Sequence, residues 1–184
     1  MFAIHTKRVF ALVVLFIAAG LAPVSVLASS DLTFNTNSPD LPLPLCDGIR
    51  VPEGNRFAYK AYAVGVQLYR WNGTTWTLVE PIATLFADPE YKGKVGTHYL
   101  GPTWEGNSGG KVVASRVNQC TPDTSAIPWL LLQTVTAEGP GVFGSITFIQ
   151  RVNTRGGLIP TAPGTSIGAV APVPYTAEYY FYRD

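Results

Sequence analysis

Residues 175–183 alternate two sets of side chains with the period of two that is typical of a β-strand. The odd positions hold Tyr175, Ala177, Tyr179 and Phe181, and the even positions hold Thr176, Glu178, Tyr180 and Tyr182. Because both sets are rich in aromatic rings, we predict a strand that is covered on both faces.

Other apolar segments, bounded by Gly, Pro, Asn and Asp, predict further strands. These segments are residues 57–71, 75–79, 98–104, 111–117, 129–136 and 145–153. Asn72-Gly73 lies between the first two and is the strongest short hairpin signal in the chain. Gly65 suggests a bulge or bend, and residues 81–87 fit either a short helix or a strand.

No window contains a convincing amphipathic helix of about ten residues or more. Many short strands separated by Gly- and Pro-rich turns indicate an all-β protein: a single-domain antiparallel β-sandwich or β-barrel with few short helices.

Residues 154–174 are rich in Gly, Pro and Thr and predict a long ordered loop. Long loops in compact domains often border a binding site.

The N-terminal residues have the pattern of a secretory signal peptide. Lys7 and Arg8 precede an apolar run, and Val26-Leu27-Ala28 offers a small-x-small cleavage site. The run is shorter than the ~20 residues that a membrane-spanning helix needs, which disfavours an uncleaved anchor. We therefore predict a signal peptide over residues 1–28, a Pro-rich arm over 29–56 and a β domain over 57–184, in a protein secreted to the periplasm or the extracellular space.

The charge balance disfavours polyanionic partners. Cleavage after residue 28 removes two of the 13 basic residues, which leaves 11 against 12 acidic residues. A nearly neutral surface has no electrostatic bias toward phosphate backbones or anionic lipid. We expect no nucleic-acid partner and no membrane contact beyond the signal peptide.

Cys46 and Cys120 are the only cysteines of the chain. In an oxidising compartment such a pair predicts one disulfide, and two buried free thiols are the alternative. Structural zinc sites need clustered ligand pairs, which this chain lacks. We therefore expect no metal and no cofactor.

Two glycine-rich segments match the sequence patterns of known sites, but the residues and elements around them do not fit those sites. Residues 139–144 satisfy G-x-G-x-x-G, yet a strand rather than a helix is predicted to follow, so we interpret them as a turn. Residues 106–110 resemble the nucleophile segment of trypsin-like proteases. His98 lies only ten positions before Ser108 with no Asp between them, which also favours a turn.

His98 is the natural candidate for proton transfer near neutral pH. A hydrolase built on it would use Glu105 to orient or share protons and Trp104 to shape the pocket, with Lys111 or Arg151 nearby. The alternative is a structural histidine that donates a hydrogen bond to a backbone carbonyl. Paired carboxylates of a glycosidase are a weaker possibility, because Asp88, Glu105 and Glu178 cannot be placed together from the sequence.

Aromatic rings offer a second chemistry. Planar rings on a β scaffold stack on sugars, and Trp76 beside the Asn72-Gly73 turn is the ring that we expect to be exposed. Asn72-Gly73-Thr74 is also an N-glycosylation sequon, although the turn alone explains these residues. For Arg151 we favour pairing with Glu105 or Glu178 over an anion-binding role, because a half-buried guanidinium is usually paired.

Five segments together resemble a known family. They are residues 63–71, 96–105, 127–132, 149–154 and 175–182. They are similar to the hallmark segments of the secreted domain-of-unknown-function family numbered 3455, over roughly residues 40–183. The resemblance implies no activity and no catalytic residues. Some members carry a malate dehydrogenase label, which the context of the 139–144 glycines does not support here.

Three functions are compatible with the sequence. The leading hypothesis is a secreted binding or surface-interaction module for a carbohydrate or another neutral polar ligand, held by Trp76, Trp104, Lys111 and Arg151. The second is a hydrolase that uses His98 and Glu105. The third is a structural envelope protein without a small ligand.

Overall fold

The computed structural model of the protein describes residues 38–184, so the predicted signal peptide lies outside the described residues. Two short 3-10 turns, η1 (Asp47–Ile49) and η2 (Val142–Ser145), accompany the strands. The strands are β1 (Arg56–Trp71), β2 (Trp76–Phe86), β3 (Lys94–Tyr99), β4 (Thr103–Gly106), β5 (Lys111–Cys120), β6 (Trp129–Glu138), β7 (Phe148–Gly156) and β8 (Val170–Arg183). In the part of the chain that is described, no helix has the length and apolar character needed to cross a membrane.

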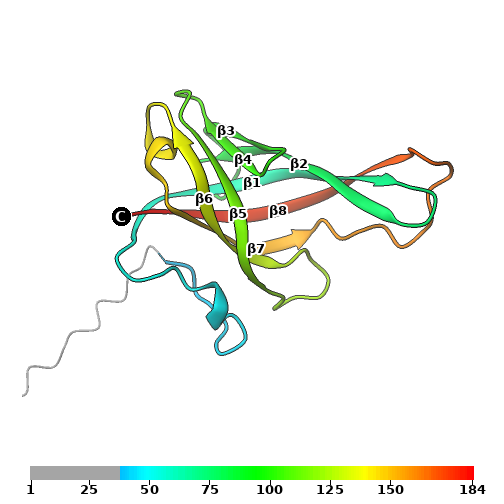
Figure 1. The fold of residues 1–184 in the computed structure, drawn as a ribbon, viewed down its shortest axis with the longest axis horizontal. Coiled ribbons are helices and arrows are strands. Elements are labelled where there is room, and N and C mark those ends of the chain that lie inside the picture. The colour runs from blue at the N-terminus through cyan, green and yellow to red at the C-terminus, as the bar shows by residue number, and fades with distance from the viewer. Residues whose placement is uncertain (1–37) are drawn as a thin grey trace, which may run out of the picture. The chain divides into compact units, whose positions relative to one another are not determined.

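The eight strands form one closed antiparallel barrel (Figure 1). Each strand pairs with its neighbour in the sequence, and β8 pairs with β1 to close the sheet. This confirms the predicted all-β class and selects the barrel from the two predicted architectures. In such a meander the turns after β1, β3, β5 and β7 gather at one end of the barrel, which we call the mouth.

Alternation of side chains along the strands separates the barrel interior from its outer wall. The main core cluster fills the interior and includes Trp104, Leu132, Ile149, Tyr179 and Phe181. Phe143 of η2 also belongs to this cluster and packs on Phe181, with ring centroids 4.8 Å apart. Aromatic packing therefore fills the barrel at the end opposite the mouth.

A second core cluster lies on the outer wall, where the residues before β1 pack against it. Its members include Ile49, Leu131, Val152, Tyr180 and Tyr182. Tyr180 and Tyr182 of β8 are thus buried outside the barrel, while the odd positions from Tyr175 to Phe181 are buried inside. The prediction of a strand covered on both faces is confirmed for the C-terminal end of β8, whereas Thr176 and Glu178 on the outer face are only partly buried.

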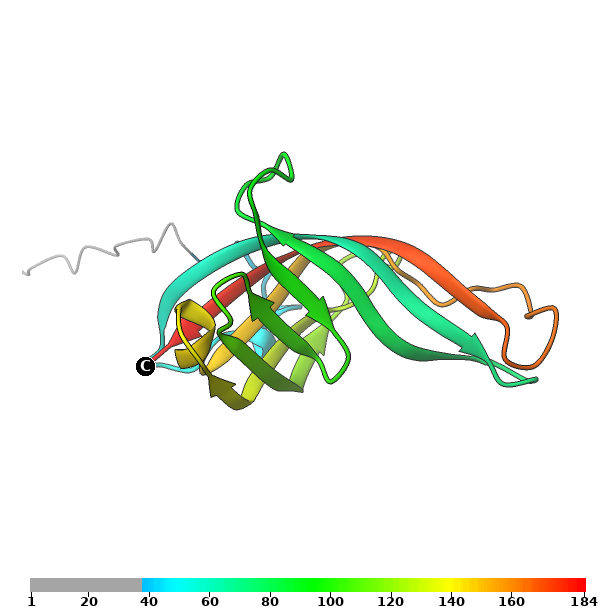
Figure 2. The same cartoon turned by 90° about the horizontal axis from the view of Figure 1, so that it is seen from above.

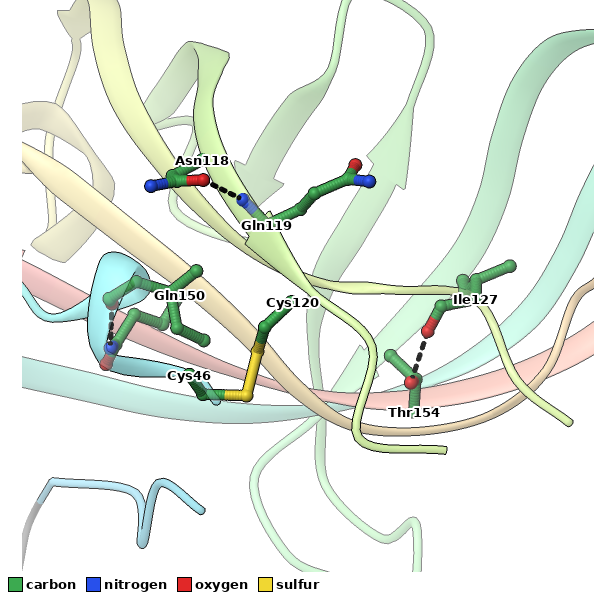
Figure 3. The surroundings of a disulfide bond; sticks show 8 residues. Cys46, Asn118, Gln119, Cys120, Ile127, Gln150 and Thr154 are labelled. Atoms are coloured by element: carbon green, nitrogen blue, oxygen red, sulfur yellow. Dashed lines mark hydrogen bonds between the residues drawn. A yellow bond between two sulfur atoms is a disulfide. The ribbon is translucent and has the colours of Figure 1, made fainter. Parts of the chain in front are cut away.

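A disulfide joins Cys46 to Cys120 at the end of β5 (Figure 3). The predicted bridge is therefore present and ties the segment before β1 to the barrel. Beside it, the Gln150 side chain donates a hydrogen bond to the Ile49 carbonyl over 2.7 Å and accepts one from the Tyr182 hydroxyl over 2.6 Å. The segment is held by covalent, polar and apolar contacts together.

Strands β1, β2 and β8 reach well beyond the rest of the barrel as a long ribbon (Figure 2). The connection from β7 to β8 spans residues 157–169, so it is shorter than the loop predicted over 154–174. Trp76 lies in this region with 9% of its surface exposed, packs against Trp71 and donates its Nε1 hydrogen to the Ala162 carbonyl. The prediction of an exposed Trp76 ring was wrong, because the loop covers it.

Three other local predictions can be compared with the observed strands. The segment 98–104 is two strands rather than one, because Leu100, Gly101 and Pro102 turn the chain between β3 and β4. Residues 81–86 are the second half of β2. The glycine-rich stretches 106–110 and 139–144 are connections between strands, as predicted.

Gly65 is not at a bulge, since the register shift of β1 lies between Leu68 and Tyr69. A Cβ atom at Gly65 would instead come within 2.1 Å of the Ile82 carbonyl oxygen and 2.5 Å of the Ala83 Cα. Only glycine leaves room for this close approach of β1 and β2.

Replacing Trp76 with phenylalanine should lower the free energy of unfolding by about 1 kcal/mol, because the hydrogen bond to the loop carbonyl is lost while most of the ring packing remains. Chemical unfolding followed by circular dichroism measures this change. Tyr62→Phe is the control, since Tyr62 lies on the outer wall at the groove and removal of its hydroxyl leaves the bond from Trp76 to the β7–β8 loop in place. An equal loss in both variants would contradict the role of the Trp76 bond.

Candidate functional site

A cavity of about 280 Å³ opens at the mouth of the barrel. Every strand contributes to its wall, together with the turns after β3 and β5. The lining residues are Gln67, Tyr69, Leu78, Pro81, His98, Pro102, Trp104, Arg116, Gln119, Ile127, Pro128, Leu130, Leu132, Arg151 and Tyr179. No acidic side chain is among them.

Strand register brings the polar residues of the cavity together. Arg151 of β7 pairs with Leu130 on one side and with Tyr179 on the other. His98 of β3 pairs with Trp104 of β4. Because paired residues project to the same face of a sheet, all of these side chains point into the barrel.

The Arg151 guanidinium is half-buried and has no carboxylate partner among the described residues. Its Nε and Nη2 atoms donate to the Pro128 carbonyl oxygen over 3.2 and 2.8 Å. The predicted pairing with Glu105 or Glu178 was wrong. Both acids project from the outer wall, where Glu105 accepts a bond from the Tyr99 hydroxyl and Glu178 pairs with Lys60.

His98 forms a hydrogen bond with a backbone carbonyl group inside the barrel. Its Nδ1 atom lies 2.8 Å from the Thr103 carbonyl oxygen, which can only accept, so Nδ1 carries the hydrogen and Nε2 is left as an acceptor. The ring stacks on Trp104 with centroids 4.2 Å apart. Burial, together with the smaller effect of the Arg151 charge, lowers the pKa of His98 to about 3 against the opposing effect of the Thr103 bond. The imidazole is therefore neutral at ordinary pH.

Several buried polar atoms at the cavity have no hydrogen-bond partner within residues 38–184. They are Gln67 Nε2, Trp104 Nε1 and the Tyr179 hydroxyl, each on a side chain at most 2% exposed. The hydroxyl of Tyr175, on the same face of β8, also has no well-formed hydrogen bond in this described part of the chain. Buried polar groups are normally satisfied, so these atoms are open to hydrogen bonds with a molecule inside the cavity, whether water or a ligand.

The charge of Arg151 acts on most titratable groups of the cavity. Burial raises the pKa of Tyr179 and, more strongly, that of Tyr175, while Arg151 opposes both changes. Burial also raises the pKa of Tyr69 against the same opposing charge. These phenols stay protonated at ordinary pH and keep their hydrogens available for donation, although the Tyr69 hydroxyl already donates to the Gly157 carbonyl.

The structure brings together three of the predicted site residues, His98, Trp104 and Arg151, and leaves the others apart. Glu105 faces away from His98, since the side chains of Trp104 and Glu105 are adjacent on β4 and alternate. Lys111 lies outside the barrel, where it pairs with Glu138 over 2.8 Å. Trp76 packs under the β7–β8 loop.

Gln67 and Tyr179 are site residues that the sequence analysis did not propose. Gln67 is a polar residue in the inward series of β1, after Ala61, Ala63 and Gly65. Tyr179 follows Ala177 in the inward series of β8. A polar side chain that follows small residues on one face of a strand is a signal that could have pointed to an internal cavity.

A larger groove of about 610 Å³ lies on the outer wall, and of the predicted site residues it contains only Glu178, one of the three candidate glycosidase carboxylates, without Asp88 or Glu105. Its wall carries charges of both signs, from Asp123, Arg155 and Glu178. Within residues 38–184, no three His, Cys, Asp or Glu side chains lie close enough to hold a metal ion.

Comparison with known proteins gives one match. The model of a protein family described as "Protein of unknown function (DUF3455)" matches residues 52–183. The matched range begins just before β1 and ends with β8, so it covers the whole barrel. No curated protein and no solved structure matches the chain.

Proposed function

The chain belongs to the DUF3455 family, as the resemblance of its five segments had predicted, and because that family description names no activity we propose a function from the barrel itself. The protein binds a small molecule in the cavity at the barrel mouth. The observation that carries this proposal is the set of buried, unpartnered polar atoms on the wall of an open cavity.

The size and wall of the cavity support a small occupant. Ligand pockets commonly measure ~300–1,000 Å³, and this one, at about 280 Å³, lies just below that range. A dry cavity of about half this volume accommodates benzene. A single-ring molecule with one or two polar groups is therefore the appropriate size, and a monosaccharide is of similar size.

The catalytic alternative has no support in the geometry of the site. A general base needs a titratable group near its operating pH. His98 has its Nδ1 hydrogen committed to Thr103 and a pKa of about 3. Glu105 lies on the other face of the sheet from His98. Binding rather than hydrolysis is the function that we infer.

We also infer that the protein works in an oxidising compartment outside the cytoplasm. The Cys46–Cys120 disulfide is the supporting observation, because such bridges persist in secreted and periplasmic proteins and are rare in the cytosol. Export through the predicted signal peptide is tested by sequencing the N-terminus of the protein recovered from the source cells. A start near residue 29 supports export, and an intact residue 1 contradicts it.

Titration calorimetry with benzamide, benzoate, phenyl phosphate and glucose tests the binding function. We expect saturable 1:1 binding of at least one of them. Leu78→Trp should weaken that binding by roughly tenfold or more, because Leu78 lines the mouth and a larger ring there obstructs entry.

Val135→Trp is the matched control, since Val135 is 63% exposed on β6 and does not line the cavity. It should leave the affinity unchanged. Absence of binding by all four probes, or equal effects of the two tryptophan variants, would overturn the proposed function.

A further inference from the structure

The polar wall of the cavity consists mostly of donors, and its charge is positive. We propose that the ligand of this site carries an anionic group, a carboxylate or a phosphate, which binds to Arg151 and Tyr179, with an apolar or aromatic body. This inference rests on the proposed function, because it names the chemical class of the molecule that the barrel binds.

The first argument is the uncompensated charge of Arg151. A half-buried guanidinium without an acidic partner is costly, so natural proteins normally pair it. Among residues 38–184, the acceptor of its well-formed hydrogen bonds is the neutral Pro128 carbonyl oxygen. Nη1 forms no hydrogen bond within residues 38–184, so the guanidinium keeps donors for a second acceptor. Arginine is well suited to bind a carboxylate or phosphate through two parallel hydrogen bonds.

The second argument is the placement of a further donor beside Arg151. Tyr179 is its direct neighbour across the β7–β8 pair. Tyr179 is 1% exposed, and its hydroxyl has no well-formed hydrogen bond within residues 38–184. Burial keeps this phenol protonated, so the hydroxyl donates rather than accepts toward an anion. An anion held between the two residues satisfies both.

The third argument is the absence of opposing charge. None of the lining residues is acidic, and a second cation, Arg116, lies toward the exposed end of the wall. Arg116 donates to the Gln119 side-chain oxygen, which leaves its charge in place. An anion entering the mouth therefore meets positive potential along its path.

The remaining wall defines the body of the ligand. Leu130 and Leu132 project from β6, and Ile127 lies in the turn before it. Trp104 also lines the cavity, with one face of its indole covered by His98 and its Nε1 donor unpartnered within residues 38–184. A single-ring or short aliphatic acid matches these surfaces better than a sugar, whose many hydroxyls would need more polar partners than this apolar side offers.

Benzoate and benzamide provide a direct test because they have nearly the same shape and differ in charge. In calorimetry with the wild-type protein, benzoate should bind about tenfold more tightly than benzamide. Arg151→Gln should remove this preference, and Arg151→Lys should keep part of it. Arg155→Gln is the matched control, since Arg155 lies on the same strand but outside the cavity. Phenyl phosphate distinguishes a phosphate from a carboxylate as the preferred anion.

The outcomes separate the two proposals. Equal binding of benzoate and benzamide by the wild type would overturn the anion inference while leaving the binding function intact. Failure of every probe to bind would overturn the binding function itself. Should Arg151→Gln fail to fold, the wild-type preference for benzoate and its decrease at high ionic strength still decide the question.

Discussion

Replacing both cysteines with alanine should lower the free energy of unfolding by about 4 kcal/mol, a larger loss than we expect from the other substitutions. The bridge joins residues 74 positions apart, and the entropy of the unfolded chain rises strongly when a loop of that length is opened. Urea unfolding of the double variant and the wild type, at equal protein concentration, measures the difference. Reduction of the wild-type disulfide during unfolding should give the same loss.

The same variant should loosen the segment before β1 selectively. Arg50 is exposed and adjoins the buried Ile49, so trypsin should cleave after Arg50 faster when the disulfide is absent. Cleavage after the exposed Arg155 in β7 serves as the internal control, because the barrel remains closed under native conditions. A loss of stability below about 1 kcal/mol, with unchanged cleavage after Arg50, would contradict the structural role of the bridge.

The strands were predictable because their signal is local. Alternation in residues 175–183 and the Asn72-Gly73 turn each depend on neighbouring residues, and both appear in the structure as predicted. The covering of Trp76 was not predictable in this way. It depends on a carbonyl at Ala162, far along the chain, whose position is set only when the barrel closes.

The site was harder to predict because it depends on register across strands that are distant in sequence. Shifting a strand by one residue moves all of its side chains to the other face. Arg151 therefore faces either a carboxylate or the cavity depending on alignments that no local pattern reveals. One part was within reach: Glu105 directly follows the predicted strand 98–104, so if the strand continues to it, Trp104 and Glu105 cannot both face the same pocket as His98.

The neutral, buried state of His98 predicts a strong dependence of stability on acid. An unfolded chain binds a proton at this residue below pH ~6.5, whereas the folded protein resists protonation down to a pKa of about 3. Because the folded pKa is the lower one, the free energy of unfolding falls as the pH decreases through this window, by about 1.4 kcal/mol per pH unit. At pH 4.5 the loss from this residue alone should be roughly 2.7 kcal/mol.

His98→Asn removes this source of acid sensitivity while its amide group can still donate to the Thr103 carbonyl. The variant loses the stacking on Trp104 and is expected to be less stable at pH 7, so the informative quantity is the change between pH 7 and pH 4.5. The decrease in the free energy of unfolding between pH 7 and pH 4.5 should be smaller in the variant by roughly 2.7 kcal/mol. Glu138→Gln is the control, because its exposed pair with Lys111 contributes little to the pH profile. Parallel pH profiles for His98→Asn and the wild type would show that His98 titrates normally in the folded protein, and the account of a neutral acceptor in the cavity wall would then fail.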